Sequence, residues 1–281
     1  MCEYCEKYGV DGQRWFLNPA NSARRLTKVR KPESESTGAG ENPNAEGGDV
    51  GMGATHVELI EMKRSGPEEY ARRLADLEKR APQHHIGQVM TLEEAQALMD
   101  ISWPIAKMTC GCRRSTRGLP DEENFSCMGM GPGMYKWERW PQIYRGGVEF
   151  TTPDQAKAYL SKLNKKGLVH IVETFGTPYV GGVCNCEYPD CSAIRGRIDY
   201  DMRWSALKGH YVAMIDMEAC NGCKKCLWRC HFRALNFSVA KNKAHINQFN
   251  CFGCGNCRSE CDFDAIQLVE RSSLPALANE W

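Results

Sequence analysis

Eight of the sixteen cysteines form two runs of identical spacing in the last quarter of the chain. The runs are Cys220-x2-Cys223-x2-Cys226-x3-Cys230 and Cys251-x2-Cys254-x2-Cys257-x3-Cys261. Three thiolates at such short intervals can hold one face of an iron–sulfur cube, whereas the fourth lies too far round and ligates the other cluster. The spacing therefore predicts two [4Fe–4S] clusters with crossed ligands. Cys220, Cys223, Cys226 and Cys261 would hold the first cluster, and Cys251, Cys254, Cys257 and Cys230 the second.

The two runs belong to an internal repeat within Tyr211–Val269. A shift of 31 positions superimposes every cysteine of one run on the other. Gly222, Gly253 and Gly255 suit the tight turns between the ligands, because glycine tolerates backbone conformations that crowd other residues. This stretch resembles the bacterial two-cluster ferredoxins. The resemblance implies a pseudo-twofold domain with two [4Fe–4S] clusters over residues 208–270.

Residues beside the ligands bear on how the clusters would behave. The ferredoxin family usually places proline after the fourth cysteine of each run, where this chain has His231 and Asp262. His231 could couple proton uptake to cluster reduction, and an ordinary surface histidine is an equal alternative. The bulky side chains of Trp228 and Phe252 are expected to shield the clusters from water.

Other uses of eight cysteines fit the pattern less well. Two four-thiolate zinc sites would use the same number of ligands, but the doubled spacing is more typical of clusters. A disulfide framework is disfavoured in a long chain without a secretion signal. Covalent haem attachment requires a C-x-x-C-H motif, and the sequence contains none.

Six further cysteines lie in the middle of the chain and suggest another site. They are Cys110, Cys112 and Cys127, followed by Cys184, Cys186 and Cys191. Four of their thiolates could make a third [4Fe–4S] site, provided that the two C-x-C pairs approach one another. Zinc or free buried thiols are the alternatives, since free cysteine often acts as a small buried hydrophobe. His170 and His210 are expected to be ordinary core or surface histidines.

The order of motifs over residues 86–270 resembles a family of larger iron–sulfur proteins. Those proteins carry a C-x-C-R motif after a capped helix, then a second capped helix ending in Gly-Leu-Val-His, a C-N-C motif and a two-cluster ferredoxin domain. The corresponding pieces here are Cys110-Gly-Cys112-Arg113, Gly167–His170 and Cys184-Asn185-Cys186. The resemblance implies flavoprotein, hydrogenase-like or heterodisulfide-reductase-like redox subunits as partners. Glu187–Asp190 stand where a denser cysteine cluster is expected.

Three helices are predicted to position the central cysteines. One covers residues 66–80 and begins with Pro67 in its first turn. Another follows the capping box Thr91-x-x-Glu94, and a third begins at Thr152, with Gln155 closing its box, and ends at Gly167. The expected fold class is α+β, in which a mainly helical cysteine-containing domain over residues 56–207 precedes the two-cluster domain.

The two ends of the chain carry different expectations. Residues 1–31 contain Cys2-x2-Cys5 and the aromatic side chains of Trp15 and Phe16, and basic residues follow. We expect a docking arm that binds a partner subunit, because such an apolar cluster must be buried somewhere. The thiols of Cys2 and Cys5 are possible ligands that cannot close a metal site alone. Residues 32–55 are predicted to be a flexible linker, and residues 271–281 a C-terminal tail.

Composition limits the class of protein. The chain has 281 residues and 42% hydrophobic content. Its net charge of +1 disfavours a zinc-dependent nucleic-acid binder, which needs a basic surface. No apolar run approaches the roughly 20 residues of a membrane span, and oxygen-sensitive clusters suggest an anaerobic cytoplasm. We expect a non-catalytic electron-transfer subunit of a hetero-oligomeric redox complex. The alternative is an iron–sulfur enzyme with an open metal site in the Cys110–Cys191 region.

Overall fold

The computed structural model describes residues 2–10, 12–22, 56–84, 87–117, 125–131, 134, 148–174 and 179–281. The predicted linker 32–55 and the basic residues 24–31 of the predicted arm lie outside this described part. No helix in these described ranges is both long enough and apolar enough to cross a membrane.

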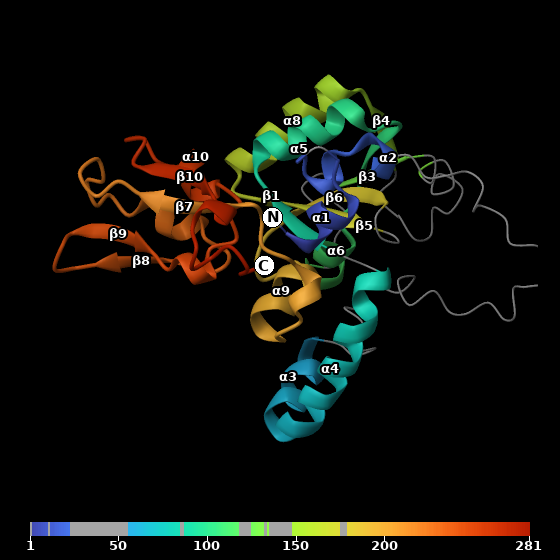
Figure 1. Ribbon diagram of the computed structural model, residues 1–281, viewed down its shortest axis with the longest axis horizontal. Coiled ribbons are helices and arrows are strands. Elements are labelled where there is room, and N and C mark those ends of the chain that lie inside the picture. The colour runs from blue at the N-terminus through green and yellow to red at the C-terminus, as the bar shows by residue number, and fades with distance from the viewer. Residues whose placement is uncertain are drawn as a thin grey trace, which may run out of the picture.

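A six-stranded antiparallel sheet forms the centre of the molecule (Figure 1). Its strands are β1 (Gly87–Met90), β2 (Ile105–Met108), β3 (Cys127–Met130), β4 (Val148–Thr151), β5 (Val169–Thr174) and β6 (Val180–Cys186). Their order in the sheet is β1-β5-β6-β3-β2-β4. The expectation of a mainly helical domain is corrected here, since the helices cover a sheet. Four of the strands have only four residues, too few to show a periodicity in the sequence.

Successive residues of each strand point to opposite faces of this sheet. Met90 and Val172 face a core formed with α5 (Leu92–Ile101) and α8 (Pro153–Lys165). Val89 and Ile171 face the other side, where α9 (Ser192–Asp199) and the C-terminal domain pack. The sheet therefore separates two apolar cores, and the second core contains cysteines from both domains.

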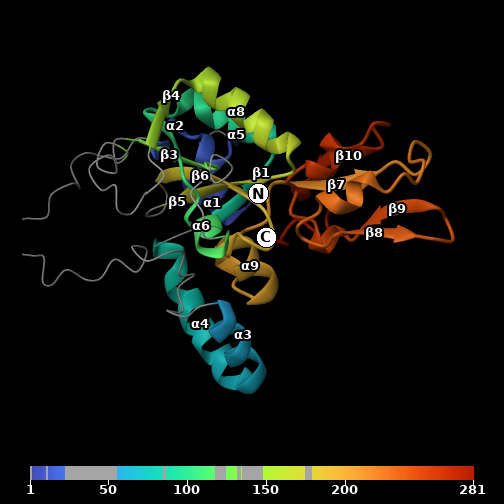
Figure 2. The same cartoon turned by 180° about the vertical axis from the view of Figure 1, so that it is seen from behind.

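The predicted helix starts are present in the structure. Thr91 and Thr152 each form a complete capping box, with Glu94 and Gln155 respectively. The first predicted helix is α4 (Pro67–His84), which packs against the unpredicted α3 (His56–Ser65). This pair extends away from the sheet beside α9 (Figures 1 and 2). The Tyr70 hydroxyl donates to the Tyr200 carbonyl oxygen at 2.7 Å and fixes the pair to the rest of the protein.

The N-terminal segment packs onto its own chain. It consists of α1 (Glu3–Tyr8), η1 (Trp15–Leu17) and α2 (Pro19–Ser22). Trp15 and Phe16 are completely buried in the core under α5, and Trp15 Nε1 donates to Gln88 Oε1 at 2.6 Å. The expectation that these aromatic side chains bind a partner subunit is therefore wrong for the described residues, because the sheet of the same chain buries them.

The C-terminal domain has the expected pseudo-twofold arrangement. Strand β7 (Tyr211–Ile215) pairs with β10 (Ile266–Glu270), and β8 (Leu235–Ser238) pairs with β9 (Lys243–Ile246). The shift of 31 positions relates β7 to β9 and β8 to β10. A short helix, η6 (Lys225–Arg229) or α10 (Asn256–Ser259), follows the first two ligands of each run.

The tail after β10 folds back to the boundary between the two domains. It begins with η8 (Arg271–Ser273). The Arg271 side chain is completely buried and donates to the carbonyl oxygens of Gly209, Tyr211 and Cys251, at 2.9, 3.1 and 2.7 Å. Further along the tail, the ring of Trp281 lies 5.5 Å from that of His210.

Candidate iron–sulfur centre

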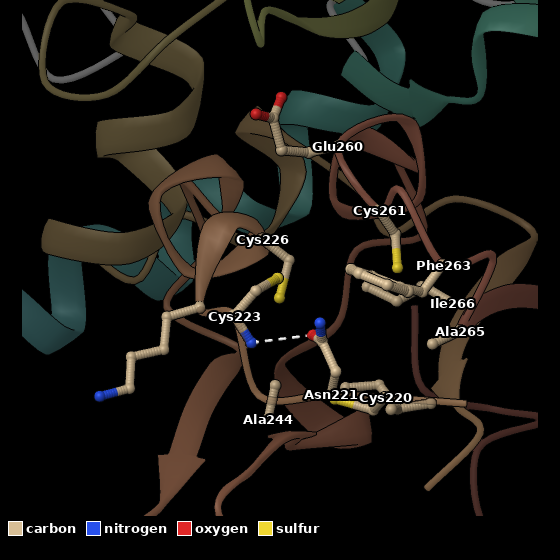
Figure 3. Close-up of a pocket in the computed structure, with 12 residues that line it drawn as sticks. Cys220, Asn221, Cys223, Cys226, Ala244, Glu260, Cys261, Phe263, Ala265 and Ile266 are labelled. Carbon is tan, nitrogen blue, oxygen red and sulfur yellow. Dashed lines mark hydrogen bonds between the residues drawn. The ribbon is translucent and has the colours of Figure 1, made fainter. Parts of the chain in front are cut away.

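Four cysteines line one cavity beside β7 and β10 (Figure 3). They are Cys220, Cys223 and Cys226 of the first run and Cys261 of the second run. The thiols of Cys223, Cys220 and Cys261 all act electrostatically on that of Cys226. The fourth cysteine of the first run, Cys230, does not line this cavity. The structure thus brings together the crossed set that the spacing predicts.

The remaining four ligand candidates converge on the side that faces the sheet. Burial is the main cause of the raised pKa of Cys257, and the nearby thiols of Cys254, Cys251 and Cys230 add to it. Backbone N–H groups point at two of these sulfurs, since Ala213 N donates to Cys251 Sγ at 3.4 Å and Ala234 N donates to Cys230 Sγ at 3.2 Å. The thiol of Cys226 also lies close enough to influence Cys257, so the two sets adjoin.

The donor chemistry of both sets fits iron–sulfur clusters. Burial raises the pKa of Cys226 to about 11 and that of Cys254 to about 12, so these thiols are neutral near pH 7 without a metal. Iron binds the thiolate, and binding therefore displaces the protons. Four sulfurs in each set match the ligand number of a [4Fe–4S] cluster, and N–H donors aimed at Cys251 and Cys230 suit an anionic cluster in the second set.

Two glycines allow the two ligand loops, residues 220–226 and 251–257, to pass close to neighbouring backbone. Gly222 and Gly253 have φ angles of +78° and +75°, which side chains rarely adopt. A Cβ atom at Gly222 would meet the carbonyl oxygen of Asn242, and one at Gly253 would meet that of Tyr211. The predicted need for glycine at these turns is confirmed.

The two ligand loops differ in exposure. Residues 251–256 are buried except for the half-buried Cys254, whereas Cys223 and its neighbours Lys224 and Lys225 are exposed. Phe252 is buried and stacks on Phe232 at 3.9 Å between ring centroids. The expected shielding by Trp228 is wrong, because that side chain is 89% exposed.

The residues that replace the usual prolines have defined contacts. His231 Nε2 lies 2.8 Å from the carbonyl oxygen of Gly167 and donates to it, while Nδ1 accepts the N–H of Tyr188 at 3.2 Å. Both ring nitrogens of the neutral imidazole are thereby used, which leaves none to take up a proton during reduction. Asp262 pairs with Lys225 at 2.5 Å and so links the two ligand runs.

The six central cysteines gather on the sheet face that packs against the C-terminal domain. Cys127 of β3 and Cys184 of β6 are direct partners across the sheet. Cys112 lies in α6 (Gly111–Arg117), and Cys191 immediately precedes α9. Neighbouring thiols interact in the order Cys112, Cys110, Cys127, Cys184, Cys186, Cys191. The thiols of Cys112 and Cys184 also act electrostatically on that of Cys191. The two C-x-C pairs therefore do approach one another.

Arg113 supplies positive charge beside this group of thiols. Its side chain is almost completely buried, and its Nε donates to Glu187 Oε1 at 2.9 Å. The same guanidinium donates to Ser126 Oγ at 2.5 Å, and the Arg113 backbone N–H donates to Cys110 Sγ at 3.5 Å. Glu187, which stands where more cysteines were expected, thus holds the arginine in place.

The two central histidines differ in their surroundings. His170 is completely buried and hydrogen bonds Asn185 Oδ1 at 2.6 Å through Nδ1, as expected for a core histidine. His210 instead lies against the sulfurs of Cys2 and Cys5. No sequence signal pointed to this contact, because His210 is separated from Cys5 by 205 positions.

The fold and the eight grouped thiols define an iron–sulfur protein domain. Residues 213–262 match the family model of the 4Fe-4S dicluster domain. The protein therefore carries an iron–sulfur, ferredoxin-type domain near its C-terminus, in an α+β structure. A comparison with the curated proteins found no match to the chain.

Proposed function

We propose that the protein transfers electrons through two [4Fe–4S] clusters and serves as the iron–sulfur subunit of a larger redox complex. The observation that carries this proposal is the common cavity of Cys261 with the first three cysteines of the other run. When bound, such clusters supply one-electron carriers. Cys220, Cys223, Cys226 and Cys261 would hold the first, and Cys251, Cys254, Cys257 and Cys230 the second.

The surrounding residues would control where electrons enter and leave. Exposed Cys223 places the first set at the surface. Cys257 of the second set adjoins Cys226 of the first. On the other side, Cys230 and Cys254 pack in the same apolar core as Cys184, Cys186 and Cys191. The three groups of thiols thus form a continuous path from the surface into the sheet domain.

We also propose that the central group holds a third metal centre. Four of the six thiols would suffice for a [4Fe–4S] cluster or a zinc ion, and buried Arg113 would offset negative charge. A second candidate function is an iron–sulfur enzyme whose open iron lies in the Cys110–Cys191 region, which requires that fewer than four of these thiols bind the cluster. If a substrate changed the spectrum of a third cluster and left the signals of the other two clusters unchanged, the enzyme hypothesis would be favoured.

The proposed partners are redox proteins such as flavoprotein, hydrogenase-like or heterodisulfide-reductase-like subunits, in the cytoplasm. Support comes from Trp228, which is exposed within the ligand run of the first set, since exposed aromatic side chains are enriched in interfaces. Affinity purification from the native host should recover redox subunits with the wild type and fewer with Trp228→Ala. Isolation of the wild type as a monomer without partners contradicts the subunit proposal.

Metal analysis and a crossed-ligation variant test the electron-transfer proposal. Anaerobic protein should contain about eight irons, or about twelve if the third centre is a cluster, and should take up electrons reversibly. In Cys261→Ala, iodoacetamide should label Cys220, Cys223 and Cys226 first. In the control Ser259→Ala, all eight ligand cysteines should stay protected from labelling. Labelling of Cys251, Cys254 and Cys257 instead would contradict crossed ligation.

A further inference from the structure

Two thiols and an imidazole meet in the core where the N-terminal segment reaches the C-terminal domain. Cys2 Sγ lies 3.2 Å from Cys5 Sγ, and His210 Nε2 lies 3.4 Å from the first sulfur and 3.0 Å from the second. All three residues are 2–3% exposed. They are a group of potential metal ligands separate from the fourteen other cysteines of the chain.

Local structure directs both sulfurs to the same point. Cys2 is the N-cap of α1, where its Sγ accepts the backbone N–H of Cys5 at 3.4 Å. A spacing of three residues places the two side chains on one side of a helical turn. His210 comes from the other end of the fold, directly before β7.

The carboxylate of Glu94 lies next to the second ring nitrogen of His210. Glu94 Oε1 lies 3.6 Å from His210 Nδ1, on the opposite side of the ring from the sulfurs. Glu94 is itself held by Arg14 Nε at 3.3 Å and by the Thr91 N–H at 2.9 Å. Metal-binding histidines commonly direct their second nitrogen to a carboxylate, which fixes the tautomer and leaves the other nitrogen free to coordinate.

We propose that Cys2, Cys5 and His210 bind a zinc ion that fastens the N-terminal segment to the start of the C-terminal domain. Two thiolates and one neutral imidazole are a typical ligand set for zinc. Binding forms two Zn–S bonds and one Zn–N bond and releases the two thiol protons. A small molecule such as water completes the tetrahedron.

The spacing of the three atoms is close to that required. With Zn–S distances of about 2.3 Å and a Zn–N distance of about 2.0 Å, tetrahedral ligand atoms lie about 3.5–3.8 Å apart. The observed separations of 3.0–3.4 Å need an outward movement of about 0.5 Å. A disulfide between Cys2 and Cys5 would instead draw the sulfurs together to about 2.05 Å.

The position of His210 explains what such an ion would stabilise. The Arg271 N–H donates to the His210 carbonyl oxygen at 2.7 Å, and the rings of Phe16 and Trp281 lie 5.7 and 5.5 Å from the imidazole. The N-terminal segment, the tail and the beginning of β7 therefore meet at this histidine. Figure 1 shows both ends of the chain near this boundary between the domains.

Zinc-edge X-ray absorption of the anaerobic, full-length wild type tests the proposal without any substitution. We expect one zinc per protein with two sulfur ligands and one nitrogen ligand. Absence of zinc, zinc bound by sulfur ligands alone, or a Cys2–Cys5 disulfide in the anaerobic protein would overturn it. Iron measured in the same sample tests the proposed clusters independently of zinc. Failure of the zinc proposal can therefore be told apart from failure of the electron-transfer proposal.

Substitutions then assign the ligands. Cys2→Ser, Cys5→Ser and His210→Gln should each lower bound zinc at least about tenfold and leave iron unchanged, whereas His245→Gln, at an exposed histidine, should alter neither. For the positioning residue, Glu94→Gln should weaken zinc about 10–100-fold in competition with a chelator. Its neighbour Glu93, which is exposed, provides the control Glu93→Gln. Full zinc retention in the three ligand variants would contradict the assignment.

Discussion

His170 shows how burial keeps a histidine neutral even between two amide side chains. Its Nδ1 donates to Asn185 Oδ1 at 2.6 Å, and Asn164 Nδ2 approaches Nε2 at 3.4 Å. Burial lowers the pKa of His170 to about 4, although the bond to Asn185 acts in the opposite direction. The ring is therefore neutral in the folded protein above about pH 4.

This histidine should make the protein less stable in mild acid. In the unfolded chain this histidine takes up a proton below its ordinary pKa of 6.5, whereas in the folded chain it does so only near pH 4. The free energy of unfolding therefore falls as the pH drops from about 6.5 to about 4. Between pH 7.5 and 5.5 this one group should cost about 1.4 kcal/mol. Anaerobic urea unfolding of the wild type and His170→Gln at both pH values measures the difference, and an equal loss in both proteins would contradict it.

The limits of sequence prediction are clearest in these side chains. The grouping of Cys261 with the first three cysteines of the other run could be predicted, because iron–sulfur ligation imposes a short, fixed spacing within each run. The contact of His210 with Cys2 and Cys5 could not, because it joins the two ends of the fold and follows no local spacing. Trp228 was misjudged for a related reason, since proximity in sequence to a ligand does not give the direction of a side chain.

Among the elements, helices were predicted better than strands. Pro67, Thr91 and Thr152 mark helix starts through local backbone chemistry, which needs no knowledge of the fold. Strands such as β2 and β3 acquire their identity from hydrogen-bonded partners elsewhere in the chain, and their four residues each are too few to show an alternation of apolar and polar side chains. The central sheet consequently had no sequence signal of its own.

The Arg271 side chain, just after β10, connects the start of β7 with the loop that carries Cys251. Replacing it by methionine would leave the buried carbonyl oxygens of Gly209, Tyr211 and Cys251 without this donor. We expect Arg271→Met to lower the free energy of unfolding by about 3 kcal/mol. Arg258→Met, which removes a partly exposed arginine paired with Glu93, should cost less than about 1 kcal/mol. Equal effects in anaerobic urea unfolding would contradict the role of Arg271.

Across the whole molecule, the proposed clusters are unequally protected. The loop from Cys220 to Cys226 faces solvent at Cys223, whereas the loop from Cys251 to Cys257 lies against the sheet domain. Asn256 Nδ2 donates to the Gly167 carbonyl oxygen at 2.7 Å, and Phe252 packs beside Ile171 and Ile194 in the shared core. Attack by oxygen should therefore begin at the first set.

Timed exposure to air followed by thiol labelling measures this order. We expect iodoacetamide to reach Cys220, Cys223, Cys226 and Cys261 several times faster than the second set, as read by mass spectrometry. Denatured protein, in which all eight thiols should react together, is the control. Simultaneous labelling of both sets in the folded protein would show that the sheet domain gives no protection.

The unequal burial of the two ligand loops has a consequence for the evolution of the repeat. The two copies have the same cysteine spacing, but only the second has its ligand loop enclosed by a neighbouring domain. Among homologues, the positions matching Asn221, Lys224 and Lys225 should vary freely, because they face solvent. Those matching Phe252, Gly253 and Asn256 should change slowly and together with their contacts in the sheet domain, so the two copies accumulate substitutions at different rates.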